Sequence, residues 1–487
     1  MASIDTLTLP ADPTSAADLA AVGLEYSRVD ADGDGFRPFQ RAVARGFLGG
    51  ESTDDEADHS RKTLRTRRLT GVFDRAGSEP EVPVGTIDSW ASTLTASPGR
   101  TTDLWSISAV TVAPTHRRRG IARAMIGGEL RTAAAAGFAL AGLTVTEATI
   151  YGRWGFSPAA WASDVVVDTR RARWTGPTAP GRLDFIARDG IVERLRAIHE
   201  RVRILRPGSV PGWDGRWRGV AGVAPGDKEA EKVRAVVYRD VDGAERGILV
   251  YTLEETDDYA AHDLSVRALF ADGDEAYAAL WRFAIEHDLV GKVKAWLQAP
   301  VPPVQWMVAD RRAVTATLTD HHWLRVLDVA GALSSRSYAA PLELVVRVDD
   351  PLGFADGNWS VRIDDAGEAV VAPAAADVPV DVDLTVGGAR FAPARRGAGH
   401  GAGVRGSRER RCSGARRRRR RLLAGGDPAA GHLVLTVVHR IPPYDSADVR
   451  STPPPRSRAR RHGSTPCGRS SVATRGRIRS PSSRVSS

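Results

Sequence analysis

One segment, residues 104–158, most constrains what this chain can fold into. Apolar and polar residues alternate over 105–111, as they do in a half-buried strand, and Pro114 ends the pattern. Three arginines and a glycine follow, and then a run of strong helix formers from 121 to 136. A second apolar run and a turn centred on Tyr151 complete the segment. The order strand, turn, helix, strand predicts a mixed α/β fold.

Length and composition limit the class of protein. A chain of 487 residues is too long for one core, so we expect several domains. No apolar run approaches the roughly 20 residues of a membrane-spanning helix, and the first thirty residues lack a secretion signal. The two cysteines are Cys412 and Cys467, so residues 1–390 have no disulfide framework or thiolate metal site. We therefore expect a cytoplasmic protein without a membrane span.

The net charge of +9 is unevenly distributed. Residues 391–487 contain 23 arginines, no lysine and four acidic residues, a net charge of +19, which leaves −10 for residues 1–390. An acidic globular part attracts cationic ligands more readily than nucleic acid. Acidic residues also gather at 51–58, where we expect either a solvated loop or a rim that attracts a polyamine.

Helix and strand patterns occur twice in the same order. The first copy has a helical pattern at 36–48 and strands at 69–73, 82–95 and 163–168 around the opening segment. The second has strands at 183–186, 233–238, 247–253, 263–270 and 291–298, with helices at 191–203 and 275–287. This repetition predicts a duplicated fold. The second copy is acidic at 271–275, where the first is triply basic, so we expect it not to bind an anionic phosphate.

A third pattern begins near His322. Alternating strands with turn signals occur at 323–329, 342–348, 357–363 and 380–386, which predicts a smaller α+β domain. His321 and His322 are adjacent, but neighbours on a strand point to opposite sides and no further ligand is spaced nearby. We therefore expect no metal site.

The turn at 117–120 has the features of a phosphate site. A helix N-terminus leaves backbone N–H groups unpaired and carries partial positive charge, which suits a pyrophosphate. Gly120 and Ala122 leave room for close approach to the backbone, while Arg118, Arg119 and Arg123 add charged donors. Cations at a helix N-terminus oppose the macrodipole, so an arginine cluster there favours an anionic ligand.

The spacing Arg117-x-x-Gly120-x-Ala122 after a strand resembles the acyl-CoA signature of the GNAT superfamily of N-acetyltransferases. With the stretches VTVAPTHRRRG and IYGRWGFSPA, the chain looks most like the enhanced intracellular survival (Eis-like) acetyltransferases, over roughly residues 25–390. The resemblance implies a duplicated mixed-sheet α/β acyltransferase fold followed by a smaller α+β sterol-carrier-protein-like domain. The domains expected are a polar lead (1–24), a catalytic GNAT domain (25–170), a second, non-catalytic GNAT-like domain (171–320), the sterol-carrier-protein-like domain (321–449, aberrant from about 391) and an Arg/Ser/Pro-rich tail (450–487).

The resemblance also implies roles for individual residues. The acetyl-CoA co-substrate would lie along the strand at 110–112, with its pyrophosphate on the turn, and Tyr151 would be the general acid that protonates the departing thiolate. A phenol suits this task because its ordinary pKa of about 10 lies just above that of a thiol. The residues expected to bind acetyl-CoA are Val110, Thr111, Val112, Arg118, Arg119, Gly120, Ile121, Ala122, Arg123, Thr146 and Glu147.

As a member of such a family, the chain would transfer acetyl to primary amines of aminoglycosides, polyamines or lysine side chains, without a metal, and would form a hexamer. The family's base is the carboxylate of the chain's own C-terminus. Here the family-like segment 426–449 lies between two arginine-rich stretches and is followed by residues to Ser487. Either the basic tail is real and binds polyanions such as nucleic acid, or two stretches are translated out of frame, which we favour. A displaced carboxylate leaves open a catalytically impaired enzyme or a non-catalytic ligand-binding protein.

Overall fold

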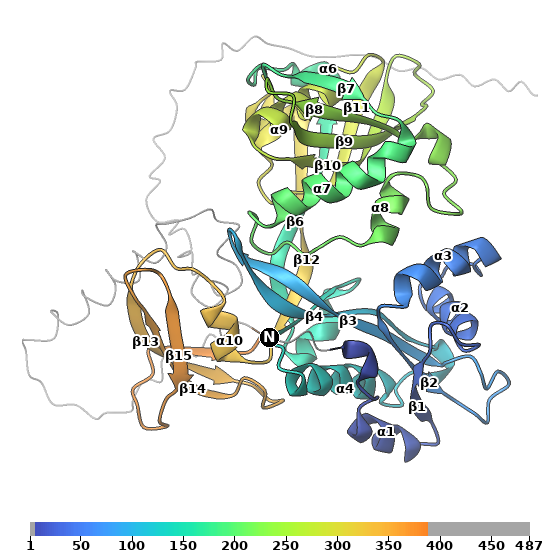
Figure 1. The fold of residues 1–487 in the computed structure, drawn as a ribbon, viewed down its shortest axis with the longest axis vertical. Helices are drawn as coiled ribbons and strands as arrows, with labels where there is room; N and C mark the ends of the chain where they lie inside the picture. Colours follow the sequence, from blue (N-terminus) through green and yellow to red (C-terminus); the bar gives the residue numbers. More distant parts are fainter. Residues whose placement is uncertain (1–4, 388–487) are drawn as a thin grey trace, which may run out of the picture. The chain divides into compact units, whose positions relative to one another are not determined.

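The computed structural model describes residues 5–387, which form two sheets with helices packed on them (Figure 1). The first repeat comprises η1 (Thr6–Thr8), α1 (Pro13–Ala20), β1 (Glu25–Val29), α2 (Phe36–Gly46), α3 (Asp54–Leu64), β2 (Arg68–Phe73), β3 (Gly85–Ser97), β4 (Arg100–Val112), η2 (Pro114–His116), α4 (Ile121–Ala135), β5 (Leu140–Thr144), α5 (Ala148–Tyr151), η3 (Gly152–Trp154) and β6 (Ser157–Asp168).

The second repeat follows directly. It comprises α6 (Thr169–Ala172), β7 (Arg182–Phe185), η4 (Arg188–Gly190), α7 (Ile191–Arg203), α8 (Asp214–Val220), η5 (Ala230–Lys232), β8 (Arg234–Arg239), β9 (Glu245–Glu254), β10 (His262–Ala271), α9 (Asp274–Ile285), β11 (Val290–Gln298), η6 (Pro303–Trp306) and η7 (Arg311–Ala313). After β12 (Val314–Val326), the remaining described elements are α10 (Val329–Ser334), β13 (Leu342–Asp349), β14 (Gly357–Ile363), β15 (Ala369–Pro373) and β16 (Val382–Thr385).

Both repeats contribute to one large sheet. Within the described residues its strand order is β1-β2-β3-β4-β5-β12-β6-β11-β10-β9-β8-β7, and a separate small sheet has the order β15-β14-β13-β16. β12 lies between β5 and β6, because His322 to Val326 pair with β5 and Val314 to Leu324 pair with β6. From the sequence, a strand at 323–329 was expected in the third domain, and residues 323–326 of it are part of β12. β12 belongs instead to the large sheet, a position that local pattern does not reveal.

Successive side chains of each strand point to opposite faces of the large sheet, and helices pack on both faces. In the first repeat, Ile121 and Met125 of α4 pack against Trp105 and Ile107 of β4. In the second repeat, α9 packs with Val236 and other inward residues of β8–β11, whereas α7 packs with the intervening residues, such as Val237. Successive side chains of a strand point to opposite faces, so α7 and α9 cover opposite faces of this part of the sheet (Figure 1).

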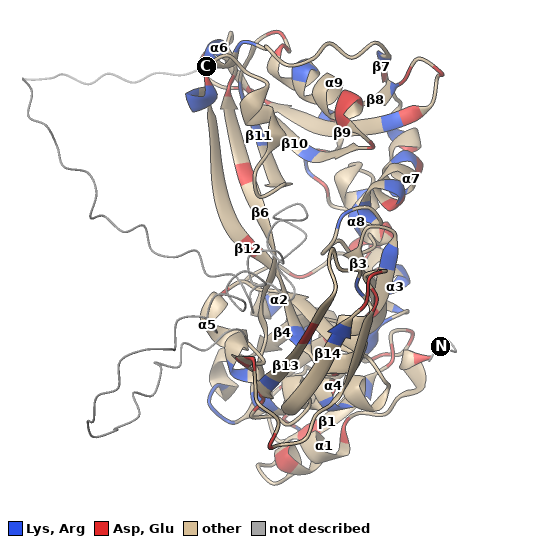
Figure 2. Cartoon of the chain, turned by 90° about the vertical axis from the view of Figure 1, so that its left-hand side faces the viewer, with Lys and Arg blue, Asp and Glu red and all other residues tan. Residues whose placement is uncertain are grey.

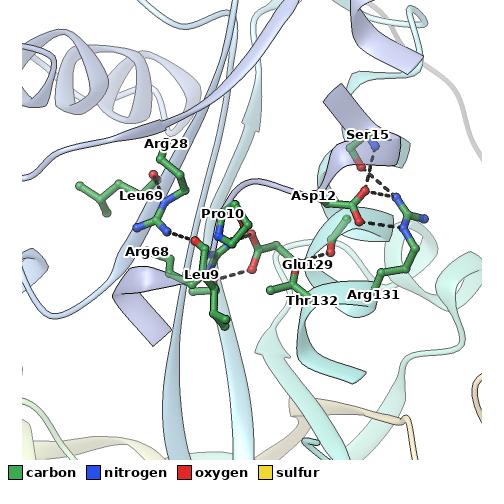
Figure 3. A network of polar contacts seen from close by, with 12 residues as sticks. Leu9, Pro10, Asp12, Ser15, Arg28, Arg68, Leu69, Glu129, Arg131 and Thr132 are labelled. Atoms are coloured by element: carbon green, nitrogen blue, oxygen red, sulfur yellow. Dashed lines mark hydrogen bonds and ion pairs between the residues drawn. The ribbon is translucent and has the colours of Figure 1, made fainter. Parts of the chain in front are cut away.

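The polar lead expected at 1–24 is docked on the first repeat from Asp12 onward. Asp12 caps α1 by accepting a hydrogen bond from the backbone N–H of Ser15 at 2.8 Å, and its carboxylate also pairs with Arg131 of α4 at 2.6 Å (Figure 3). Buried Arg68 donates to the Leu9 and Pro10 carbonyls and lies 3.4 Å from buried Glu129. These contacts fix α1 against α4, the helix that carries the arginine-rich turn.

The acidic stretch near residue 54 is a helix and not the loop that its composition suggested. Thr53 and Glu56 form a reciprocal capping box at the start of α3, and Asp54, Asp55 and Glu56 occupy its first turn. Carboxylates are favourable at that end of a helix, which explains why an acidic run folds here.

Charged side chains of both signs are interspersed along α7 (Figure 2). Arg194 pairs with Glu245 at 3.0 Å, and Arg196 pairs with Asp214 at 2.8 Å. The apolar face of α7, including Leu195 and Ile198, is buried. No helix in residues 5–387 is long and apolar enough to cross a bilayer.

Candidate functional site

Strands β4 and β5 form a fork in the middle of the large sheet. They are paired in parallel only at Trp105 with Ala141 and at Ser106 with Gly142. Beyond Ser106, β4 continues to Val112 along β3, while β5 continues to Thr144 along β12. The two strands therefore separate and leave backbone facing the opening between them.

A bulge in β4 accompanies this separation. The register against β3 shifts between Thr86 and Asp88, and Ala109 has a positive φ of 49°. The hydroxyl of Thr86 donates to the Ala109 carbonyl at 2.8 Å and lies 2.7 Å from the hydroxyl of Thr111. Bulges redirect strands next to functional sites, and here hydrogen bonds from a buried threonine hold the bulge in place.

The arginine-rich turn lies at the start of α4, close to the end of β4. Gly120 is the N-cap residue with φ of 80°, a backbone conformation that favours glycine. A Cβ added to Gly85, the partner of Val112, would lie 2.7 Å from the Ile121 side chain, so the helix begins over the end of β4, where β4 pairs with β3. The first turn of α4 has no acidic residue and no side-chain cap. Its backbone N–H groups are therefore available to an anion.

The arginines of the turn differ in their partners. Arg119 donates to the Val22 carbonyl at 2.9 Å and lies 3.9 Å from Asp74, so it is directed toward the protein. Asp74 also pairs with His116 at 3.0 Å, and this hydrogen bond holds the pKa of the Asp74 carboxyl below its usual value. Arg118 and Arg123 are exposed and have no ion-pair partner among residues 5–387. Unpaired cations at a helix N-terminus are unfavourable unless an anion binds there.

Tyr151 ends α5, the short helix that follows β5. Its side chain is buried in the same apolar cluster as Ile121, and Val110 and Val112 pack against that cluster. The rings of Trp154 and Phe156 lie 6.2 Å from the Tyr151 ring. Burial raises the pKa of the Tyr151 phenol above its usual value of about 10. The phenol therefore keeps its proton at neutral pH and is available as a proton donor.

A pocket of about 720 Å³ opens beside the fork, and we call it the fork pocket. Residues of β4 and β5 at the last paired positions line it, together with His322 of β12 and Trp213, which precedes α8. The side chains and backbone that line it are Arg67, Trp90, Ala91, Ser92, Thr93, Asp103, Ser106, Ile107, Ser108, Ala136, Gly137, Phe138, Gly142, Leu143, Thr144, Val210, Pro211, Gly212, Trp213 and His322. Both repeats thus contribute to its wall.

Comparisons with known proteins identify the family of the chain. Two family models, each described as "Acetyltransferase (GNAT) domain", match residues 30–159 and 208–326. An uncharacterized N-acetyltransferase of Streptomyces griseus is 32% identical over 345 residues, 68% of this chain and 82% of the relative. N-acetyltransferase Eis of Mycobacterium tuberculosis is 32% identical over 305 residues, 60% of this chain and 71% of Eis. The crystal structure of Eis1 from Mycobacterium abscessus aligns with a TM-score of 0.60 at 25% identity, covering 74% of this chain and 87% of Eis1.

This chain belongs to the Eis-like N-acetyltransferases of the GNAT superfamily. The resemblance read from the sequence and the duplicated GNAT fold are thereby confirmed. GNAT enzymes transfer the acetyl group of acetyl-CoA, so the chain is an acyltransferase. The small sheet is described only to Thr385, and residues 388–487, with the expected C-terminal base and the basic tail, lie outside the described residues.

Within this Eis-like protein, the residues expected to bind acetyl-CoA fall into two groups. Val110, Thr111, Val112 and the turn from Arg118 to Arg123 lie along the fork and at the start of α4. Thr146 and Glu147 are exposed after the end of β5, and Glu147 accepts a hydrogen bond from the Thr149 hydroxyl. Neither group lines the fork pocket, which begins at Ser106 to Ser108, before the bulge.

Sequence reasoning missed the fork-pocket residues. Arg67, Trp90 and Trp213 come from three separate segments, and no spacing in the chain links them. From the sequence, His322 was not expected to bind a metal ion. In the structure it lines the pocket, and burial lowers its pKa to about 4, so its imidazole is neutral. Among the described residues, no group of three or more side chains suited to a metal ion occurs.

Proposed function

We propose that this protein transfers the acetyl group of acetyl-CoA to primary amines of small polycations, such as aminoglycosides and polyamines, or of lysine side chains. The observation that carries the proposal is the fork between β4 and β5 at the start of α4. The fork offers backbone from Val110 to Val112 to the pantetheine arm, and the turn offers Gly120, Ala122 and the exposed cations Arg118 and Arg123 to the pyrophosphate.

In the proposed reaction, the neutral amine in the fork pocket attacks the thioester carbonyl. A carbon–nitrogen bond forms and the carbon–sulfur bond breaks, while the negative charge on the carbonyl oxygen is stabilised by a backbone N–H of the fork. Tyr151 donates its proton to the departing thiolate, a role supported by its protonated phenol and by its place in the apolar cluster against which Val110 and Val112 pack. The amine's extra proton goes to a base, which in the family that the chain resembles is the carboxylate of the chain's own C-terminus, and that part of this chain lies outside the described residues.

We also propose a homo-oligomer, a hexamer by family resemblance. Support comes from large apolar side chains exposed on β11 and β12, the strands that flank β6. Trp296 is 52% exposed and Leu318 is 53% exposed. Exposed apolar surface of this kind is typical of protein interfaces. For the small sheet we propose a sterol-carrier-protein-like domain, supported by α10, whose Val329 packs with Val346 and Val361 of β13 and β14.

Release of free thiol from acetyl-CoA, measured with a panel of polyamines, aminoglycosides and lysine peptides, tests the function. We expect turnover with at least one amine and an acetyl-CoA-induced rise in melting temperature that Arg118→Ala reduces. The same thermal shift in a chain ending at Val449 separates cofactor binding from the effect of residues 450–487. Absence of both turnover and thermal shift in the two proteins would overturn the assignment.

A further inference from the structure

Arg67 occupies an unusual place in the wall of the fork pocket. Its guanidinium carbon lies 3.7 Å from the centre of the Trp90 ring in β3 and 5.6 Å from the centre of the Trp213 ring. Trp213 belongs to the second repeat and Trp90 to the first. A guanidinium over an aromatic face is held by dispersion and by attraction to the ring's negative face. One arginine therefore stacks with an aromatic residue from each repeat.

Asp88 holds the Arg67 guanidinium in place through an ion pair. Arg67 donates to the two Asp88 carboxylate oxygens at 3.4 and 3.3 Å, and both side chains are at most one-tenth exposed. Asp88 precedes Trp90 by two residues on β3, so the two side chains leave the same face of the sheet. Ser89 points to the other face, where it donates to Glu129 of α4. The strand thus supplies both the ring and the carboxylate that Arg67 contacts.

The pair also determines the charge of the pocket. Arg67 and Asp103 are the two charged residues among those that line it, and no ion pair of Asp103 is found in the described part of the chain. With Asp88 ionised, the charge of Arg67 is compensated and Asp103 leaves the pocket favourable to a cation. With Asp88 neutral, an uncompensated guanidinium faces the entering amine, and in a poorly hydrated site such a charge acts strongly.

We propose that Arg67 is a specificity-determining residue of the fork pocket: it holds Trp90 and Trp213 as one aromatic wall, and its pairing with Asp88 permits multiply charged amines to bind. This inference rests on the proposed function, because it assumes that the fork pocket takes the acceptor amine. Burial raises the pKa of the Asp88 carboxyl to about 6, Arg67 opposes this rise and Glu129 adds to it. Binding of multiply charged amines should therefore weaken below about pH 6.

Calorimetric binding of two probes, spermine and benzylamine, tests the inference without requiring turnover. In Asp88→Asn the charge of Arg67 is uncompensated, so we expect spermine affinity to fall by about fivefold for each of its charges that enters the pocket. Benzylamine, with one charge, should lose about fivefold in total. Asp240→Asn removes a carboxylate from an ion pair with Arg246 in the second repeat, and neither residue lines the fork pocket, so both affinities should stay unchanged.

Two further variants separate charge from packing. Arg67→Met removes the charge and the stacking together, so benzylamine affinity should fall while the preference for spermine over benzylamine increases. Combining Arg67→Met with Asp88→Asn restores the charge balance and should return that preference to the wild-type value. Equal losses for both amines in Asp88→Asn, or wild-type protein that binds neither amine, would overturn the inference. Thiol release by wild type with another amine would leave the proposed acetyltransferase intact in either case.

Discussion

Arg325 and Asp350 form a buried ion pair in which one guanidinium nitrogen donates to both carboxylate oxygens, at 2.8 and 2.6 Å. Arg325 belongs to β12 of the large sheet, whereas Asp350 follows β13 of the small one. Asp350 also accepts hydrogen bonds from the backbone N–H groups of Leu352 and Ala355. The pair therefore joins the two sheets and caps the turn after β13. A Cβ added to Gly155, just after the Tyr151 turn, would lie 2.9 Å from Nε of Arg325, so the same arginine also abuts the proposed catalytic segment.

Replacing Asp350 with alanine should destabilise the protein strongly. The change leaves the Arg325 guanidinium buried without its charge partner and leaves two backbone N–H groups unpaired. Breaking a buried ion pair in this way typically costs about 3–5 kcal/mol. Urea denaturation followed by tryptophan fluorescence measures the loss. Asp383→Ala, which removes an exposed partner of Arg347, is the matched control and should change stability by less than about 1 kcal/mol.

Tyr151→Phe should lower kcat by about 10²-fold or more while leaving the KM for acetyl-CoA nearly unchanged, because it removes only the proton donated to the thiolate. Thiol release under saturating amine measures this split. Tyr259→Phe removes the hydroxyl of a 75% exposed tyrosine and serves as the control. An unchanged kcat in Tyr151→Phe would exclude the phenol as the general acid.

Gly120→Ala should weaken acetyl-CoA binding more than it weakens folding. Gly99, with φ of 76° in the β3–β4 turn, and Gly120, with φ of 80°, carry similar backbone strain on substitution, and neither has a close neighbour at the Cβ position. Each alanine variant should therefore lose about 1 kcal/mol of stability. In Gly120→Ala alone, the added methyl group obstructs the approach of phosphate to the backbone. A comparison of KM for acetyl-CoA in the two variants isolates this effect.

Much of the fold could be predicted because its elements have strong local periodicity. The helix at 121–136 and the strands at 263–270 and 291–298 lie within a few residues of α4, β10 and β11. Two of the elements that were missed are too short to show such a pattern. α8 is only seven residues long and β15 only five. β12 belongs to the large sheet, although its place in the chain, just before the strands of the small sheet, suggests otherwise. Its pairing with β5 and β6 depends on contacts between residues far apart in the sequence.

The candidate site divides in the same way. Residues proposed to act through the backbone of one continuous segment, such as Val110 to Val112 and Gly120, could be proposed from spacing. The wall of the fork pocket could not, because Arg67, Trp90 and Trp213 meet only after β2, β3 and the second repeat have assembled. An arginine beside an aromatic residue is a common surface feature, so sequence alone gives no reason to select these three.

Asp88 should give the stability of the protein a distinctive pH dependence. Its pKa is about 6 in the folded protein, raised by burial, against about 3.9 in an unfolded chain. Between these values the folded state binds the proton more tightly, so the free energy of unfolding falls as pH rises from 4 to 6. Asp88→Asn lacks this titration. The stability of wild type relative to Asp88→Asn should therefore decrease by up to about 3 kcal/mol across this range and stay constant above pH 7. Urea titrations of both proteins at pH 4, 5, 6 and 7 measure the difference. A difference that rises with pH would mean that Arg67 lowers the pKa of Asp88 by more than burial raises it.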